Sequence, residues 1–219
     1  MESVNGTNGL GQHPAPGVNG ALSMAPRHPA GEIVDTSVQG FAAQACELNQ
    51  SPPFGSFVKV TTPERTVYGV IYAIHTGSLE PGGRAVLRGH DGMRDRAIFE
   101  QNPDLEHLLR TEFSALIVGF AEHGALRTYL PPGPPPLHWS VVECDPAEIT
   151  ALTTRLDYLR TILSSPEAPV DALLAANIRL AGAAHLDESV FRARAGRELA
   201  TLLKHDYPRL SAVLRALVD

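Results

Sequence analysis

The sequence predicts an α+β protein in which a small, closed all-β barrel of about six or seven strands precedes a C-terminal helical bundle. Two observations lead to this prediction. Between residues 31 and 145, short apolar runs alternate with turns that contain Gly and Pro, as in strand-rich domains. After Cys144, apolar residues recur at helical spacing. We therefore expect a multi-domain chain, with a barrel at 31–145 and a helical domain at 146–219.

Residues 1–30 differ in composition from the rest of the chain. Gly, Asn and Pro are frequent there, and large apolar side chains are few. Such a segment cannot bury enough apolar surface to offset the entropy cost of ordering it. We expect a disordered tail, and the sequence does not indicate a role for it.

The first strands of the barrel are expected in order along the chain. EIVDTS and FAAQACEL are short strands separated by a turn that contains glycine. The Pro-Pro-Phe-Gly turn at 52–55 follows, where the prolines fix the backbone and the glycine allows positive φ. FVKVTT and TVYGVIYAIHT then predict a hairpin. Both faces of its second strand are apolar, so we expect that strand at the centre of the sheet.

A long excursion over residues 78–101 shows no clear period and is expected at the surface. The segment 102–113 then predicts a short helix, because Asn102 can cap it and Pro103 suits its first turn. The apolar run 114–120 is a strand, and the chain turns at Gly124 and returns as another strand.

The proline-rich stretch LPPGPPPLHW, residues 130–139, has two possible interpretations. It could be a polyproline ligand for a partner, which is expected in a disordered segment. It lies instead between two predicted strands, and proline cannot donate to a sheet ladder, so the segment has to cross an edge or an end of the sheet. We favour this structural interpretation, with Trp139 as an anchor in the core or at its rim.

The helical region begins at a capping box, Asp145-Pro146-Ala147-Glu148, with proline at the first helical position. A helix is expected from this point to residue 163, where the following PEAP sequence ends it. Three further helices are expected within residues 170–186, 187–205 and 208–218.

Charge is unevenly distributed over the chain. Residues 31–150 carry 8 Lys and Arg against 15 Asp and Glu, whereas residues 151–219 carry 9 against 8. The net negative charge of the barrel region argues against nucleic acid as the main partner, because binding to phosphate requires a basic surface. No apolar run is long enough for a membrane helix and no signal peptide is visible. The two cysteines, Cys46 and Cys144, suit buried thiols in a reducing cytoplasm better than a disulfide.

Four features of residues 31–150, taken in order, resemble the HAS-barrel family. They are the Gly-Glu-Ile-Val strand at 31–34, the Pro-Pro-Phe-Gly turn at 52–55, the Tyr-Gly-Val-Ile strand at 68–71 and the proline-rich link before the final strand. This small β-barrel is named for HerA-type DNA translocases and ATP synthases, in which it precedes the motor core. The chain contains no G-x-x-x-x-G-K-[ST] motif, and the region after the barrel is too short for that motor. The resemblance implies a stand-alone barrel.

The residues that could carry chemistry do not form a known pattern. The histidines are scattered, without the H-x-x-x-H or H-E-x-x-H spacing of metal sites. His138 and Cys144 could act as a base and a nucleophile, but Cys144 ends a strand, where a buried thiol is usually inert. We therefore expect no catalytic residue, metal or cofactor.

Two groups of residues are candidates for interaction. Arg192, Arg194 and Arg197 form a basic cluster, interpreted either as a solvated helix face balanced by Glu188 and Glu198 or as a docking patch. The last two helices are rich in leucine and valine, most of which should form the core, and a surplus could serve self-association or a partner. The candidate interaction residues are Arg192, Arg194, Arg197, Trp139, Leu214 and Leu217.

Together these observations predict a non-enzymatic assembly or adaptor protein of the cytoplasm. As the resemblance implies, its barrel would dock onto a ring-forming HerA-type ATPase or an associated nuclease in DNA processing, and a homo-oligomer is possible. The alternative is a nucleic-acid-binding module that uses the barrel or the helix face from Arg192 to Arg197.

Overall fold

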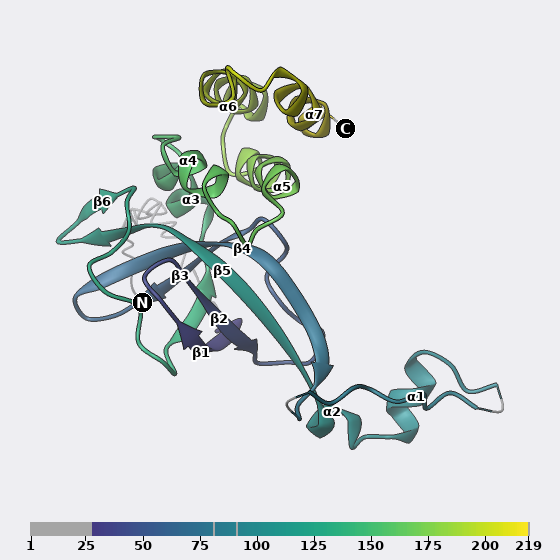
Figure 1. Ribbon diagram of the computed structural model, residues 1–219. Helices are drawn as coiled ribbons and strands as arrows, with labels where there is room; N and C mark the ends of the chain where they lie inside the picture. The colour runs from purple at the N-terminus through teal and green to yellow at the C-terminus, as the bar shows by residue number, and fades with distance from the viewer. Residues whose placement is uncertain (1–27, 81, 91, 219) are drawn as a thin grey trace, which may run out of the picture.

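The computed structural model describes residues 28–80, 82–90 and 92–218. It confirms the predicted fold class, because a closed six-stranded antiparallel β-barrel with one extra strand is followed by C-terminal helices (Figure 1). Residues 1–27 of the expected tail lie outside the described residues.

The sheet has the strand order β2-β1-β7-β3-β4-β5-β6, and every neighbouring pair is antiparallel. An additional pairing of β2 with β5 closes the barrel, and β6 extends from β5 outside the closed ring. The strands are β1 (Gly31–Thr36), β2 (Gly40–Ala45), β3 (Phe57–Thr61), β4 (Arg65–Ser78), β5 (Leu109–Glu122), β6 (Ala125–Arg127) and β7 (Ser140–Glu143).

The barrel interior is a hydrophobic core to which all six barrel strands contribute. The alternation of buried and partly buried residues along β2, for example, sends every second side chain inward. Three phenylalanines belong to this interior, and the most deeply buried of them is Phe113 of β5, which is 1% exposed. The interior residues are Ile33, Phe41, Ala43, Ala45, Val58, Val60, Val67, Ile71, Phe113, Ala115, Ile117, Phe120 and Val141.

The proline-rich stretch is the connection from β6 to β7, as the structural interpretation predicts. Pro131 and Pro135 are buried, so the segment packs onto the fold. At its end, the backbone N–H of His138 donates to the carbonyl of Ile33 at 2.9 Å, and this contact leads the chain into β7. The prolines carry the chain across the end of the barrel without requiring ladder hydrogen bonds.

Seven helices are described. Two short ones, α1 (Arg96–Gln101) and α2 (Leu105–Leu108), lie between β4 and β5. The predicted capping box at the start of α3 is present, with Asp145 accepting from the Glu148 N–H at 2.8 Å and Glu148 accepting from the Asp145 N–H at 2.9 Å. The C-terminal helices are α3 (Pro146–Leu152), α4 (Tyr158–Leu163), α5 (Val170–Gly182), α6 (Glu188–Leu202) and α7 (Tyr207–Val218).

The expected single helix ending at residue 163 is wrong, because the chain breaks between α3 and α4. The hydroxyl of Thr153 donates to the Ile149 carbonyl at 2.7 Å, and that of Thr154 to the Thr150 carbonyl at 3.0 Å. Such side-chain bonds compete with the helical backbone bonds, and here they coincide with the end of α3.

The expected helix over 102–113 is also wrong in length. Only α2 forms there, and β5 begins at Leu109, five residues before the predicted strand. The cause is the ladder with β4, which continues as far as the pair Ser78 and Leu109 and overrides local helix propensity. Helix α1 lies within the excursion, for which the sequence shows no clear period.

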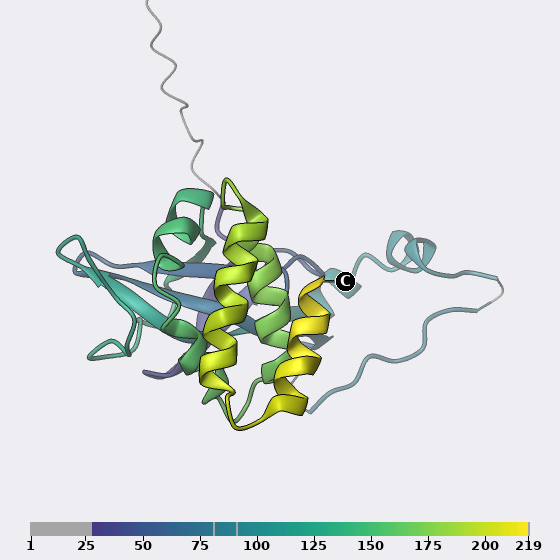
Figure 2. The same ribbon diagram turned by 90° about the horizontal axis from the view of Figure 1, so that it is seen from above.

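The C-terminal helices pack on the outer face of the barrel and share one hydrophobic core with it. Outward-facing barrel residues such as Phe57 and Leu116 join the same buried cluster as Leu159 and Leu173 of the helices. The ring of Phe57 meets that of Tyr158 edge-on at 5.4 Å. Seen from above, α5, α6 and α7 lie side by side over the barrel (Figure 2).

One buried polar contact fastens α5 to the Pro-Pro-Phe-Gly turn. Asn177 is fully buried; its amide donates to the Gly55 carbonyl at 2.9 Å and accepts from the Tyr158 hydroxyl at 2.9 Å. Gly55 has a φ of +88°, and a Cβ there would lie only 2.8 Å from the backbone nitrogen of Asn177. The turn therefore needs glycine for its backbone angle and for its close approach to α5.

The prediction that the 66–76 strand is central holds for only part of β4. Residues up to Ile71 lie between β3 and β5, as expected for an apolar strand. Beyond Ile71, β4 pairs only with β5 among the described residues, and it becomes an edge strand. The side chains from Ala73 to Thr76 are all exposed.

Candidate functional site

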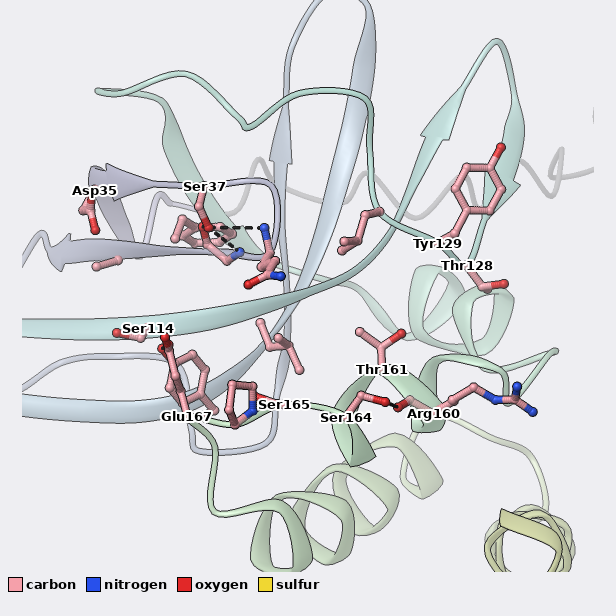
Figure 3. A pocket seen from close by; sticks show the side chains of 18 residues that line it. Asp35, Ser37, Ser114, Thr128, Tyr129, Arg160, Thr161, Ser164, Ser165 and Glu167 are labelled. Atoms are coloured by element: carbon pink, nitrogen blue, oxygen red, sulfur yellow. Dashed lines mark hydrogen bonds between the residues drawn. The ribbon is translucent and has the colours of Figure 1, made fainter.

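A groove of about 560 Å³ lies on the outer face of the barrel, where the barrel meets the helical region (Figure 3). Strands β2 and β5 supply one wall, and the segments 128–130 and 160–167 supply the other sides. The lining residues are Asp35, Ser37, Gln39, Gly40, Phe41, Ala42, Tyr72, Ser114, Leu116, Thr128, Tyr129, Leu130, Arg160, Thr161, Ser164, Ser165, Pro166 and Glu167.

Three small residues on the paired strands, Gly40, Ala42 and Ser114, leave room for the groove. Gly40 lies opposite Leu116 in the β2–β5 ladder, and Ala42 lies opposite Ser114. Because neighbouring strand residues point to opposite faces, Ala42 faces out of the barrel while Ala43 packs inside it. Because these side chains are short, the strand surface is recessed between the segments 128–130 and 160–167.

The rim of the groove is polar and carries charges of both signs. Asp35, Glu167 and Arg160 contribute the charges, and Figure 3 places Asp35 and Arg160 on opposite sides of the groove. The Tyr72 hydroxyl donates to Glu167 at 3.0 Å. Burial, followed by the hydrogen bond to Glu167, raises the pKa of Tyr72 above its ordinary value, so this hydroxyl stays a neutral donor at physiological pH.

The ring of Tyr129 stands at the edge of the groove. It packs edge-on against Phe120 at 5.5 Å, yet most of its surface is exposed. An exposed aromatic ring beside an apolar floor and a polar rim suits the binding of a polypeptide segment, whose side chains and backbone need both kinds of contact. The described lining contains neither histidine nor cysteine.

The arginine cluster predicted from the sequence is divided between internal and external roles. Arg194 donates to the Thr153 carbonyl at the end of α3 at 2.6 Å, and its guanidinium lies 5.5 Å from the centre of the Phe191 ring. Arg192 donates to the Leu217 carbonyl at 3.3 Å and pairs with Glu188. Arg197 is the exposed member of the cluster.

The other predicted interaction residues lie mostly inside the fold. Leu217 is only 4% exposed and Leu214 packs against the same core, so both leucines of α7 face the helical cluster. Trp139 is 39% exposed, and its indole N–H donates to the Thr61 carbonyl at 2.9 Å. It therefore anchors the start of β7 at the rim of the barrel, as the sequence predicts.

His138 and Cys144, considered as a base and a nucleophile, lie in different environments. His138 is exposed, and its Nδ1 lies 2.6 Å from a carboxylate oxygen of Glu32. Cys144 is buried in the core beneath the helices. Within the described part of the chain, no group of three or more His, Cys, Asp or Glu side chains could hold a metal ion.

The groove itself is not predictable from the sequence. Its wall residues come from segments separated by long stretches of chain, and no motif marks any of them. Only the alternation within FAAQACEL indicates that Ala42 faces away from the interior, and nothing in the sequence indicates that α4 approaches it.

No protein family matches the chain, and no curated protein matches it either. In the described ranges, no helix has both the length and the apolar character needed to cross a membrane.

Proposed function

We propose that this protein is a non-enzymatic assembly protein of the cytoplasm. Its β-barrel docks onto a ring-forming ATPase of the HerA type, or onto a nuclease associated with one, in DNA processing. The resemblance of residues 31–150 to a HAS-barrel without the motor supports the choice of partner. The outer groove of the barrel supports the mode of binding, because it offers a partner both apolar floor and polar rim.

The groove is the observation on which this proposal rests. Its floor is lined by Ala42 and Leu116, and its rim carries two carboxylates and one guanidinium. A phosphate backbone requires a basic surface, so this rim suits a segment of protein better than a nucleic acid. The internal contacts of Arg192 and Arg194 also weaken the alternative of a nucleic-acid-binding helix face.

The test is affinity purification of the tagged full chain from its native host, with and without nuclease digestion, read by mass spectrometry. The Ala42→Arg variant places a long charged side chain in the groove. Ala200→Arg, on the exposed side of α6, is the matched control. We expect a stoichiometric ATPase or nuclease that survives digestion, is lost with Ala42→Arg and is retained with Ala200→Arg.

Two outcomes would overturn the proposal. Partners recovered only through nucleic acid would disappear on digestion and would favour the nucleic-acid-binding alternative. ATP hydrolysis by the purified protein alone, at the rate of a functional ATPase, would contradict the assignment as a non-enzymatic protein.

A further inference from the structure

The end of the β4–β5 ribbon has an open edge that a second copy of the chain could cover. Residues 73–78 of β4 keep a regular register with β5, from the pair Ala73 and Ser114 to the pair Ser78 and Leu109. Their other side has no strand beside it among the described residues. The irregularity between Ile71 and Ala73 marks the point where β4 leaves β3.

The hydrogen bonds define which backbone groups are open. The N–H of Leu79 donates to the Leu108 carbonyl at 2.8 Å, so residue 79 faces β5. Backbone groups alternate in direction along a strand, so the N–H and C=O groups of Ile74, Thr76 and Ser78 point away from β5. Three residues thus present a row of donors and acceptors to the exterior.

This edge lacks most of the features that normally prevent strands from pairing between molecules. Residues 72–78 read YAIHTGS and contain no Pro, Lys, Arg, Asp or Glu. Ile74 is 43% exposed on the edge, although it is a β-branched apolar residue. Natural edge strands are usually protected by charge, proline, bulges or covering elements. Only the bulge is present here, and it lies at the barrel end of the segment.

We propose that the chain forms a two-fold symmetric dimer in which the 73–78 edges of two copies pair antiparallel, centred on Thr76. In this register Thr76 lies opposite Thr76 of the second copy, and Ile74 lies opposite Ser78. All three outward residues then find hydrogen-bonding partners. An isologous contact of this kind closes on itself and leaves no free edge for further growth.

The neighbouring excursion supplies the additional surface that such a dimer needs. The described residues between 79 and 108, here called the arm, extend away from the barrel (Figures 1 and 2). Val86 is 71% exposed and Leu87 is 94% exposed on the arm. A short ladder alone is small beside the roughly 1,200–2,000 Å² buried by stable interfaces. A dimer through this edge therefore requires the arm as well.

Antiparallel pairing places the arm of each copy beside the barrel of the other copy. Because the strands run in opposite directions, the Ser78 end of one copy, where its arm begins, lies beside the end of β4 that enters the other barrel. The outgoing limb of the arm, residues 82–90, carries Arg84 and Arg88 and no acidic residue. The barrel strands and loops without the arm, residues 31–78 and 109–145, carry 4 Lys and Arg against 8 Asp and Glu. Arg84 of this limb can therefore meet a barrel of opposite charge, whereas Arg88 already pairs with Asp104 at 3.5 Å and residues 79–108 as a whole carry 4 Arg against 6 Asp and Glu.

The first test is the oligomeric state of the purified full chain, measured by sedimentation over the micromolar range. Thr76→Lys and Thr76→Glu each place like charges at the two-fold axis, and each variant should be a monomer. An equimolar mixture of the two should dimerise again, because opposite charges then face each other. Both substitutions also remove the contact of Thr76 with Thr111 in the same chain. If that loss destabilised the fold and so prevented dimerisation, mixing the two variants would not restore the dimer. The mixture therefore distinguishes strand pairing between copies from destabilisation of the single chain.

The second test addresses the arm. Leu87→Glu alters a side chain that is almost fully exposed in a single copy, so folding should not change. If the arm covers the second copy, the dimer dissociation constant should rise at least about tenfold. A wild-type chain that is monomeric throughout, or a Thr76 pair without rescue, would overturn the dimer. An unchanged dissociation constant for Leu87→Glu would overturn the role of the arm.

Discussion

Replacing Asn177 with Leu tests whether one buried amide fastens the helical region to the barrel. Leucine has a similar volume but cannot hydrogen-bond, so the Tyr158 hydroxyl and the Gly55 carbonyl both lose their partner. Each unsatisfied buried group costs about 1–3 kcal/mol, which predicts a loss of about 2–6 kcal/mol in the free energy of unfolding. That is a large share of the roughly 5–15 kcal/mol by which a domain is usually stable.

The assay is urea unfolding followed by two signals. Fluorescence of the single tryptophan reports on the barrel, and far-ultraviolet circular dichroism reports on the helices. Because barrel and helices share one core, the two transitions should coincide in the wild-type chain. In Asn177→Leu both midpoints should fall together.

A double-mutant cycle isolates the polar contact. Tyr158→Phe removes the hydroxyl, so in the Asn177→Leu background it should restore about 1–3 kcal/mol, whereas in the wild-type background it should destabilise. Strictly additive effects, or an Asn177→Leu variant within about 0.5 kcal/mol of wild type, would refute the assigned role of the amide.

Three further predictions concern other contacts of the fold. Gly55→Ala places a side chain at positive φ against α5, so it should lower the free energy of unfolding by about 1–3 kcal/mol in the same assay. An unchanged free energy of unfolding would contradict the packing described. Arg194→Ala removes a charged hydrogen bond to the Thr153 carbonyl and should lower the free energy of unfolding by about 1.5–3 kcal/mol. Arg197 is exposed, so Arg197→Ala should change it by less than about 0.5 kcal/mol. Equal effects would show that Arg194 contributes no more to stability than Arg197. Burial, and then the nearby Glu148, raise the pKa of Tyr68 from 10.0 to about 12, so the folded chain retains a proton that the unfolded chain loses. Stability should therefore fall as pH rises through this window, and Tyr68→Phe should reduce that slope in unfolding measured at several pH values; an unchanged slope would contradict the shift.

The parts of the fold that local sequence controls were predictable. The capping box at Asp145 and the proline connection before Trp139 are determined by residues adjacent in the chain. The start of β5 at Leu109 was not predictable, because its ladder with β4 decides it. The break after Leu152 was missed because it coincides with side-chain bonds of Thr153 and Thr154 that apolar spacing does not reveal. Local propensity is a weak guide wherever a long ladder or a shared core competes with it.

The candidate site illustrates the same limit. The groove exists because Ala42 of β2 and Arg160 of α4, more than a hundred residues apart, enclose one space. A single sequence carries no signal for such a meeting. Two of the three arginines in the predicted cluster, Arg192 and Arg194, are bound to backbone carbonyls, which helical spacing alone cannot reveal.

The position of β7 has a consequence for synthesis of the chain on the ribosome. This strand is the last of the barrel in sequence, yet it lies between β1 and β3, pairing Val141 with Gly31 and Val142 with Lys59. Until residues 140–143 have left the ribosomal tunnel, both neighbouring strands present unpaired edges. A nascent chain of this protein therefore passes through an aggregation-prone interval that ends only when its final strand inserts, and chaperones that shield strand edges should act within that interval.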